Sequence, residues 1–238
     1  MSNPEGPYPG RQVFLGMTDS KNPCFAYLIT GRSPESRERK AVQIDSSIRI
    51  GPLGNTPYDP LRHYNAIKYD NHSGIATVSN GIQTEAIFET YRLLFNTASV
   101  PSPEYMEKIM EGAKAEPDSY HTPRIAGIIT GSRVNPVLII GIKAQDLPAK
   151  TIQITSRQGT ITGISTYKGS LDNPEARDPS ATLPEIEFTG RSADELATYL
   201  FNISIESYKG NDIRVCAIGG IRADNLFWNI SIINAHKA

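Results

Sequence analysis

Two strongly apolar segments near the middle of the chain place the main constraint on its fold. Residues 125–131 contain no charged side chain, and residues 137–143 contain only the terminal Lys143. Runs of this kind are typical of strands that are buried on both faces, so the sheet that holds them needs a covering layer on each side. Two stacked sheets flanked by helices would provide those layers, although the order of elements alone does not establish the stacking.

The other apolar segments are short and are separated by clusters of Gly, Pro, Asn and Asp, which is typical of strands joined by turns. We expect these further strands at residues 12–17, 24–30, 41–44, 65–69, 75–79, 151–155, 160–167, 214–218 and 227–233. Two helices fall between the fifth of these strands and the central pair, and one precedes the last two strands. Strands and helices are segregated rather than alternating, which predicts an α+β fold with mainly antiparallel sheets.

The three helices are predicted from cap residues and apolar spacing. The first opens near Asn80, where Gln83 is placed to form a reciprocal cap. The second begins at Ser102, which precedes a proline, and the third begins at Ser192, which forms a capping box with Glu195. The side chains expected on the buried faces are Ile87, Tyr91, Leu94 and Phe95, then Met106, Ile109, Met110 and Ala113, and finally Leu196, Tyr199, Leu200 and Ile203.

Composition excludes several classes of protein. The chain has 238 residues and a net charge of −1, whereas proteins that bind duplex nucleic acid usually carry a basic excess. Two cysteines, Cys24 and Cys216, are too few for a disulfide framework or a four-cysteine zinc site. The first residues lack the pattern of a signal peptide, and no stretch reaches the roughly 20 apolar residues of a membrane span. We therefore expect a cytoplasmic protein with no nucleic-acid or membrane partner.

The length fits one large domain. Residues 1–10 hold three prolines and two glycines and are expected to form a flexible N-terminal arm. Residues 11–238 are expected to form a single catalytic domain. Residues 168–184 are polar and proline-rich, and they are long for a connection inside a compact domain, which indicates a lid, an interface loop or a mobile segment.

Two polar segments carry side chains that suit a small anionic ligand. In residues 31–37, Arg32 and Arg37 project from a turn that follows a strand. Guanidinium groups can donate paired hydrogen bonds to phosphate, but a solvated basic loop is the alternative interpretation. Tyr64 and Asn65 add hydrogen-bonding groups at what is otherwise an ordinary strand start.

A third polar segment, residues 116–124, leads directly into the first central strand. It contains Glu116, Asp118, Thr122 and Arg124. A buried carboxylate in such a segment can act in proton transfer, whereas the alternative is a polar connection that caps the preceding helix. No metal or cofactor motif accompanies it, because the chain lacks a phosphate-binding Gly-rich loop, a dinucleotide fingerprint and a paired-histidine motif. We therefore expect neither a metal nor a cofactor.

Several short motifs occur in a characteristic order over about the first 145 residues. These are Tyr8-Pro9-Gly10-Arg11, Ala26-Tyr27, the pair Arg32 and Arg37, Tyr64-Asn65, Val78-Ser79-Asn80-Gly81 and Thr122-Pro123-Arg124-Ile125-Ala126. In order and approximate spacing they resemble the archaeal-type IMP cyclohydrolase family. One departure is Pro34, which stands where that family usually has an aromatic residue.

The resemblance implies a four-layer αββα sandwich, like that of N-terminal-nucleophile hydrolases but without self-processing. It also implies the reaction, which is the dehydrative closure of 5-formamidoimidazole-4-carboxamide ribotide to inosine monophosphate (IMP) in de novo purine biosynthesis. The ligand would then be a small nucleotide, and the protein would form a homo-oligomer.

The chemistry of that ring closure suggests a role for each candidate residue. The carboxamide nitrogen is a poor nucleophile because its lone pair is delocalised, so holding it against the formyl carbon supplies much of the rate. We expect Arg32 and Arg37 to hold the phosphate, with Arg124 as a third candidate. We expect Tyr64 to donate a hydrogen bond to the formyl oxygen, and Glu116, or alternatively Asp118, to move the amide proton. The residues expected to position the substrate are Asn65, Asn80 and Thr122.

Two other classes of function stay open. An N-terminal-nucleophile amidohydrolase of another substrate needs its nucleophile at the start of a core strand, beside its own amine. Ser2 lies instead in the expected arm, and Cys24 would require internal cleavage. A non-catalytic nucleotide-binding module would keep the phosphate pocket without turnover. Pro34 also leaves open an enzyme of the same type with a shifted substrate.

Overall fold

The structure, a computed structural model, describes residues 3–4 and 6–236. Two large sheets dominate it, and all neighbouring strands in both are antiparallel. The six-stranded sheet has the order β13 (Glu185–Glu187), β10 (Thr160–Ser165), β1 (Arg11–Met17), β2 (Pro23–Thr30), β16 (Arg214–Arg222) and β17 (Trp228–Asn234). The seven-stranded sheet has the order β3 (Arg39–Ile44), β4 (Ser47–Pro52), β5 (Tyr64–Tyr69), β6 (Ala76–Ser79), β7 (Arg124–Gly131), β8 (Pro136–Lys143) and β9 (Lys150–Ile154). The predicted α+β class is confirmed.

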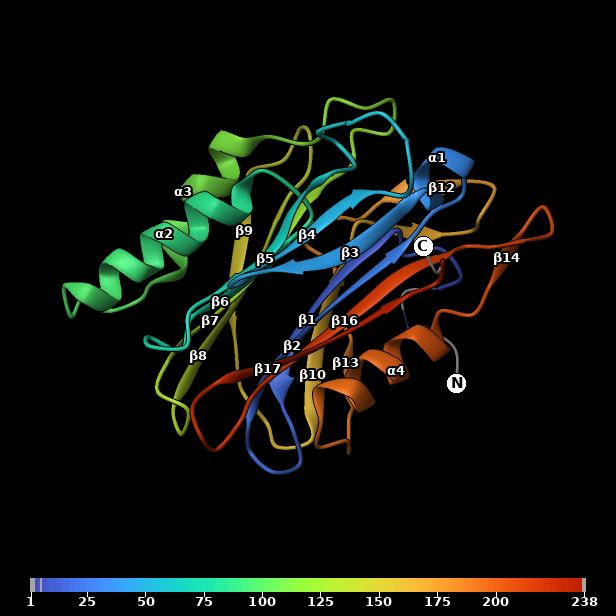
Figure 1. The fold of residues 1–238 in the computed structure, drawn as a ribbon. Helices are drawn as coiled ribbons and strands as arrows, with labels where there is room; N and C mark the ends of the chain where they lie inside the picture. Colours follow the sequence, from blue (N-terminus) through green and yellow to red (C-terminus); the bar gives the residue numbers. More distant parts are fainter. Residues whose placement is uncertain (1–2, 5, 237–238) are drawn as a thin grey trace.

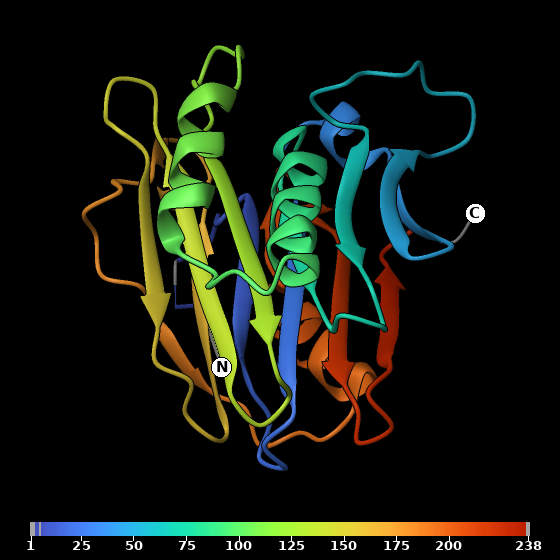
Figure 2. The same cartoon turned by 90° about the vertical axis from the view of Figure 1, so that its left-hand side faces the viewer.

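The sheets stack face to face, with helices on both outer surfaces (Figure 1). On the six-stranded sheet, α4 (Ala193–Ile203) packs against β16 and β17. The seven-stranded sheet is covered by α2 (Gln83–Asn96) and α3 (Pro103–Ala113), which face the viewer in Figure 2. Along β7, Ile125 belongs to the core between the sheets, whereas Ile128 belongs to the core beneath the helices. This central strand is buried on both faces, as expected, in a four-layer αββα sandwich.

Two of the three predicted helix starts are confirmed by their caps. The side chains of Ser102 and Ser192 accept hydrogen bonds from backbone N–H groups of the first turns of α3 and α4, and the capping box of α4 is complete. The predicted cap of α2 is wrong, because this helix begins at Gln83 without a side-chain cap. Asn80 instead links two strands to the helix start, since its Oδ1 accepts hydrogen bonds from the backbone N–H of Ile125 and from Gln83 Nε2, at 2.8 and 3.0 Å.

Some elements differ from the sequence-based expectations. The unexpected ones are β4, β13, the short helix α1 (Pro34–Arg37), the hairpin of β11 (Tyr167–Gly169) and β12 (Pro174–Ala176), and the hairpin of β14 (Ser207–Tyr208) and β15 (Asn211–Asp212). The segment 168–184 is therefore partly a hairpin. Phe95, expected on the buried face of α2, is 42% exposed, because at the end of the helix its ring meets His72 rather than the sheet.

The N-terminal segment contacts the body of the protein through several of its described residues. The Asn3 side chain exchanges hydrogen bonds with Gln12, and the Tyr8 ring stacks on Tyr167 with 5.7 Å between ring centroids. Met1, Ser2 and Glu5, which belong to the expected arm, lie outside the described residues. Within the described ranges, no helix has the length and apolar character needed to cross a membrane.

The backbone of α4 comes close to its sheet at Gly219 of β16. A Cβ atom there would lie 2.3 Å from the carbonyl oxygen of Ala193 and 3.0 Å from the amide nitrogen of Ala197, both in the helix backbone. Gly219→Ala should therefore lower the free energy of unfolding by about 1–3 kcal/mol, because the helix must move to relieve the overlap. Urea denaturation measures this effect. Gly51→Ala in β4, where no atom lies within 4 Å of the added Cβ, is the control, and equal midpoints for the two variants would contradict this packing.

Candidate active site

A cavity of about 590 Å³ opens where β1 begins and β2 ends. This volume lies in the range of small-molecule binding sites. The charged side chains that line it are the cations Arg11, Arg32, Arg39, Arg62 and Lys209 and the carboxylates Asp59, Glu116 and Asp118. The excess of positive charge favours an anionic ligand, although the chain as a whole is close to neutral.

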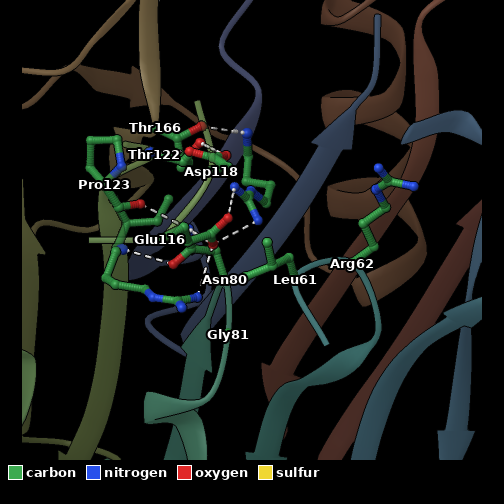
Figure 3. Close-up of polar contacts among 12 residues, drawn as sticks. Leu61, Arg62, Asn80, Gly81, Glu116, Asp118, Thr122, Pro123 and Thr166 are labelled. Atoms are coloured by element: carbon green, nitrogen blue, oxygen red, sulfur yellow. Dashed lines mark hydrogen bonds and ion pairs between the residues drawn. The ribbon is translucent and has the colours of Figure 1, made fainter. Parts of the chain in front are cut away.

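Glu116 is the centre of the buried part of this cavity (Figure 3). Its side chain is 2% exposed, and its carboxylate accepts hydrogen bonds from three neighbours. Arg11 donates to both oxygens, at 2.9 and 2.8 Å, and Arg124 donates to Oε1 at 2.9 Å. Asn80 Nδ2 donates to the same Oε1 at 3.2 Å. With two guanidinium groups around one carboxylate, the cluster keeps a net positive charge.

Three distant segments bring this cluster together. Arg11 and Arg124 are the first residues of β1 and β7, two strands that contact each other across the interface between the sheets. Glu116 lies in the connection after α3, where its backbone N–H donates to the carbonyl of Thr122 at 2.9 Å. Gly81 leaves the space for one guanidinium, because a Cβ there would lie 2.2 Å from Nη1 of Arg124.

The electrostatics of the two arginines differ. Burial alone would lower the pKa of Arg11, but the Glu116 carboxylate and then the phenols of Tyr64 and Tyr27 outweigh it and raise this pKa. Burial lowers the pKa of Arg124, since the attraction of Glu116 only partly offsets desolvation. Both guanidiniums remain charged near neutral pH.

Tyr64 approaches this cluster together with a second tyrosine. Its Oη lies 2.8 Å from Oη of Tyr27, which is fully buried. Burial, and then the nearby Tyr64, raise the pKa of Tyr27, so this phenol keeps its proton. Tyr64 also lines a second cavity, of about 470 Å³, together with Asn65. The loop 58–63 separates the two cavities, because it contributes side chains to both.

Asp118 is fixed by the residue that leads into β7. It accepts hydrogen bonds from the backbone N–H of Thr122 at 2.8 Å and from its Oγ1 at 2.5 Å. The Thr122 hydroxyl also contacts the hydroxyl of Tyr167. Burial raises the pKa of Tyr167, so it too stays protonated. Asp118 is therefore held in one orientation at the cavity wall.

Arg32 and Arg37, the pair predicted to hold phosphate, occupy different positions. Arg32 lines the cavity, donates to the carbonyl of Leu171 at 2.7 Å and to Oη of Tyr120 at 2.8 Å, and lies 5.2 Å from the ring centroids of Tyr8 and Tyr120. Arg37 does not line the cavity but donates to the backbone carbonyl of Arg32. The structure thus places only one of the two at the cavity wall.

The predicted site residues fall into four sets. Arg32, Glu116, Asp118 and Thr122 line the first cavity, and Asn80 and Arg124 donate hydrogen bonds to the Glu116 carboxylate. Tyr64 and Asn65 line the second cavity, and Arg37 lines neither. Sequence reasoning misses Arg11, Tyr27 and Arg39 as site residues. A signal exists for Arg11, because the strand that it starts holds no other charged residue, and a charged residue that is buried in such a strand needs a partner.

Comparisons with known proteins show the family of this chain. The family model described as "IMP cyclohydrolase-like protein" matches residues 8–225, which include every residue of the Glu116 cluster. The IMP cyclohydrolase of Methanocaldococcus jannaschii is 28% identical over 198 residues, covering 82% of this chain and 86% of the relative. That of Methanococcus maripaludis strain C6 is 30% identical over 197 residues, covering 82% and 88%. That of Methanothrix thermoacetophila is 26% identical over 224 residues, covering 92% and 96%.

The matches span both sheets, the helices and the cavity, so they concern the whole αββα unit rather than one motif. The chain is a member of the IMP cyclohydrolase-like protein family.

Proposed function

We propose that this chain is an IMP cyclohydrolase, which closes 5-formamidoimidazole-4-carboxamide ribotide to IMP in the cytoplasm. The observation that carries the proposal is the buried cluster of Glu116, Arg11 and Arg124 at the base of a cation-lined cavity, in a chain of this family. We further propose residues 11–238 as one catalytic domain that acts as a homo-oligomer without a metal or cofactor.

The reaction forms one bond and breaks another. The carboxamide nitrogen attacks the formyl carbon, a C–N bond forms, and the formyl C–O bond breaks. The oxygen leaves as water, with one proton from the carboxamide nitrogen and one from the formamide nitrogen. Both reacting groups belong to one molecule, so a site that holds them in contact supplies much of the rate.

We propose a division of roles in which Tyr64, which lines the second cavity but interacts with Arg11 of the Glu116 cluster, acts together with that cluster. Tyr64 is the donor for the formyl oxygen, and buried Tyr27 can donate to Tyr64 so that the Tyr64 proton points to the substrate. Glu116 is the first candidate for accepting the amide proton, and Asp118 is the second. Thr122 orients Asp118.

The other candidate residues contribute indirectly. Asn80 and Arg124 hold the Glu116 carboxylate, so their effect on the substrate passes through it. Asn65 bonds Arg49 and Glu85 at 3.2 and 2.6 Å in the second cavity, which suits a role in positioning the segment that carries Tyr64. Arg37 fixes the backbone of Arg32.

Arg32→Ala should mainly raise KM, by about 10-fold, because a charge-assisted contact at the cavity wall is lost while the Glu116 cluster stays intact. Steady-state kinetics with the formylated ribotide measure this. Arg191→Ala, whose side chain is 75% exposed, is the matched control. If KM is unchanged, Arg32 does not belong to the binding surface.

The test of the function is a spectrophotometric assay of the purified protein with 5-formamidoimidazole-4-carboxamide ribotide. We expect IMP to form without added metal or cofactor. Binding of the ribotide without turnover would instead identify a nucleotide-binding module.

The amidohydrolase alternative has less support. Cys24 lies within β2 and is fully buried, and burial raises the pKa of its thiol to about 12, so it is not a nucleophile near neutral pH. Ser2 lies outside the described residues, and the mass of the intact chain tests whether it becomes the N-terminus.

A further inference from the structure

Most cations of the first cavity have partners within the described part of the chain. Arg11 is paired with Glu116 at 2.8 Å. Arg62 is paired with Asp59 at 3.3 Å, and it stands apart from the Glu116 cluster in Figure 3. Arg11 therefore cannot bind a ligand anion without giving up a carboxylate, and the charge of Arg62 is offset by Asp59 in a partly exposed ion pair.

Two further cations lie against aromatic rings. Arg32 is held by Tyr120 and by the carbonyl of Leu171, and Lys209 lies 5.2 Å from the ring centroid of Tyr208. Arg39, the remaining cation of the cavity, has a different environment.

Arg39 is a buried guanidinium without a counter-ion. It is the first residue of β3, it is only 5% exposed, and it still lines the cavity. Its Nε donates to the carbonyl of Ser36 at 2.8 Å. Among the described residues, no carboxylate forms an ion pair with it, and its two terminal nitrogens have no hydrogen-bond partner. The α1 turn thus holds the guanidinium through Nε, and the two terminal nitrogens stay available in a side chain that lines the cavity.

The surroundings of Arg39 do not neutralise its charge. Burial, and then the charge of Arg39 itself, lower the pKa of His63, which is therefore neutral at pH 7. Tyr27 and Cys216, which also interact with Arg39, keep their protons, because burial raises the pKa of each. A buried cation without a partner costs free energy, and an incoming anion would remove that cost.

We propose that Arg39 is the principal anion anchor of this cavity and that it binds the phosphate monoester of the nucleotide ligand. A planar fork with two free arms matches two oxygens of a phosphate group. This assignment moves the phosphate from the turn that carries Arg32 and Arg37 to the start of β3. The identity of the ligand rests on the proposed function, whereas the anion site itself rests on Arg39 alone.

The test compares IMP with inosine, which lacks the phosphate, by isothermal titration calorimetry. Arg39→Gln should raise the Kd for IMP by about 10- to 100-fold and leave the Kd for inosine unchanged, since only the charge-assisted contacts are lost. Arg39→Lys keeps the charge but not the planar guanidinium, so its Kd for IMP should lie between that of the parent protein and that of Arg39→Gln. Arg92→Gln, which removes an exposed guanidinium of α2 paired with Glu89, is the matched control and should bind IMP as the parent protein does.

Thermal unfolding separates binding from folding. Because Arg39 has no carboxylate partner among the described residues, Arg39→Gln should unfold without ligand at a temperature no lower than the parent protein. Inorganic phosphate should raise the unfolding temperature of the parent protein and not that of the variant. If Arg39→Gln does not fold, Arg39→Lys decides: a raised Kd for IMP supports the anchor, and an unchanged one overturns it.

Failure of this inference can be told apart from failure of the proposed function. Turnover of the formylated ribotide by the parent protein, together with unchanged IMP affinity in Arg39→Gln, would overturn the anchor and leave the function standing. Absence of turnover, together with loss of phosphate-dependent binding in Arg39→Gln, would support the anchor and remove the function.

Discussion

Glu116→Gln should lower kcat by about 10²- to 10⁴-fold, the range expected when a group that moves a proton is removed. It should also lower the free energy of unfolding by about 3–5 kcal/mol, because two buried guanidiniums lose their common counter-ion. The amide that replaces the carboxylate can accept from only one oxygen, whereas Arg11 now donates to both oxygens and Arg124 to one of them. The losses of kcat and of stability both follow from removal of the carboxylate charge, so they should appear together.

Steady-state kinetics and urea denaturation, both at a temperature where the variant is folded, measure these effects. Glu111→Gln is the matched control, because Glu111 is 53% exposed and water screens its ion pair with Lys143. Asp118→Asn distinguishes the two candidate carboxylates. If Asp118→Asn abolishes turnover while Glu116→Gln loses only stability, Asp118 is the proton acceptor and Glu116 has a structural role.

Tyr64→Phe should lower kcat by about 10²- to 10³-fold with little change in KM, since one donor to the developing oxyanion is lost while the phosphate contacts remain. A smaller loss of stability, about 1–3 kcal/mol, should accompany it, because the fully buried Tyr27 hydroxyl loses the partner that it has among the described residues.

The control for this variant is Tyr105→Phe on α3, where the side chain is 40% exposed and lines neither cavity. Its kinetic constants should match those of the parent protein. A Tyr64→Phe variant with full activity would exclude Tyr64 from the chemistry, and a rise in KM without a fall in kcat would make it a binding residue only.

Elements specified by near neighbours can be predicted from the sequence. The predicted starts of α3 and α4 are confirmed, since a cap acts within one helical turn. The two central strands are confirmed as well, because their apolar runs admit no exposed face. The sequence analysis misses β4, because its alternation of Ile48, Arg49 and Ile50 is only three residues long and ends at Gly51-Pro52.

Asn80 shows where such reasoning fails. Its spacing to Gln83 indicates a helix cap, but β7 runs beside it in the folded chain and supplies the N–H of Ile125 and the carbonyl of Pro123 as partners. With these bonds made, Asn80 Nδ2 faces Glu116 instead of capping α2. Hydrogen bonds to a segment far away in the sequence thus outweigh the local tendency of Asn80 to cap a helix.

The sequence by itself determined the two central strands, the starts of α3 and α4, the α+β order of the elements, and the motifs that link the chain to its family, because each depends on residues close together along the chain. Only the tertiary structure decided which polar side chains share one cavity. Arg11 lies 105 positions from Glu116, and Arg39 is distinguished only by the lack of a nearby carboxylate among the residues that the structure describes. Charges interact according to their separation and burial in the folded protein, and local sequence patterns carry neither quantity.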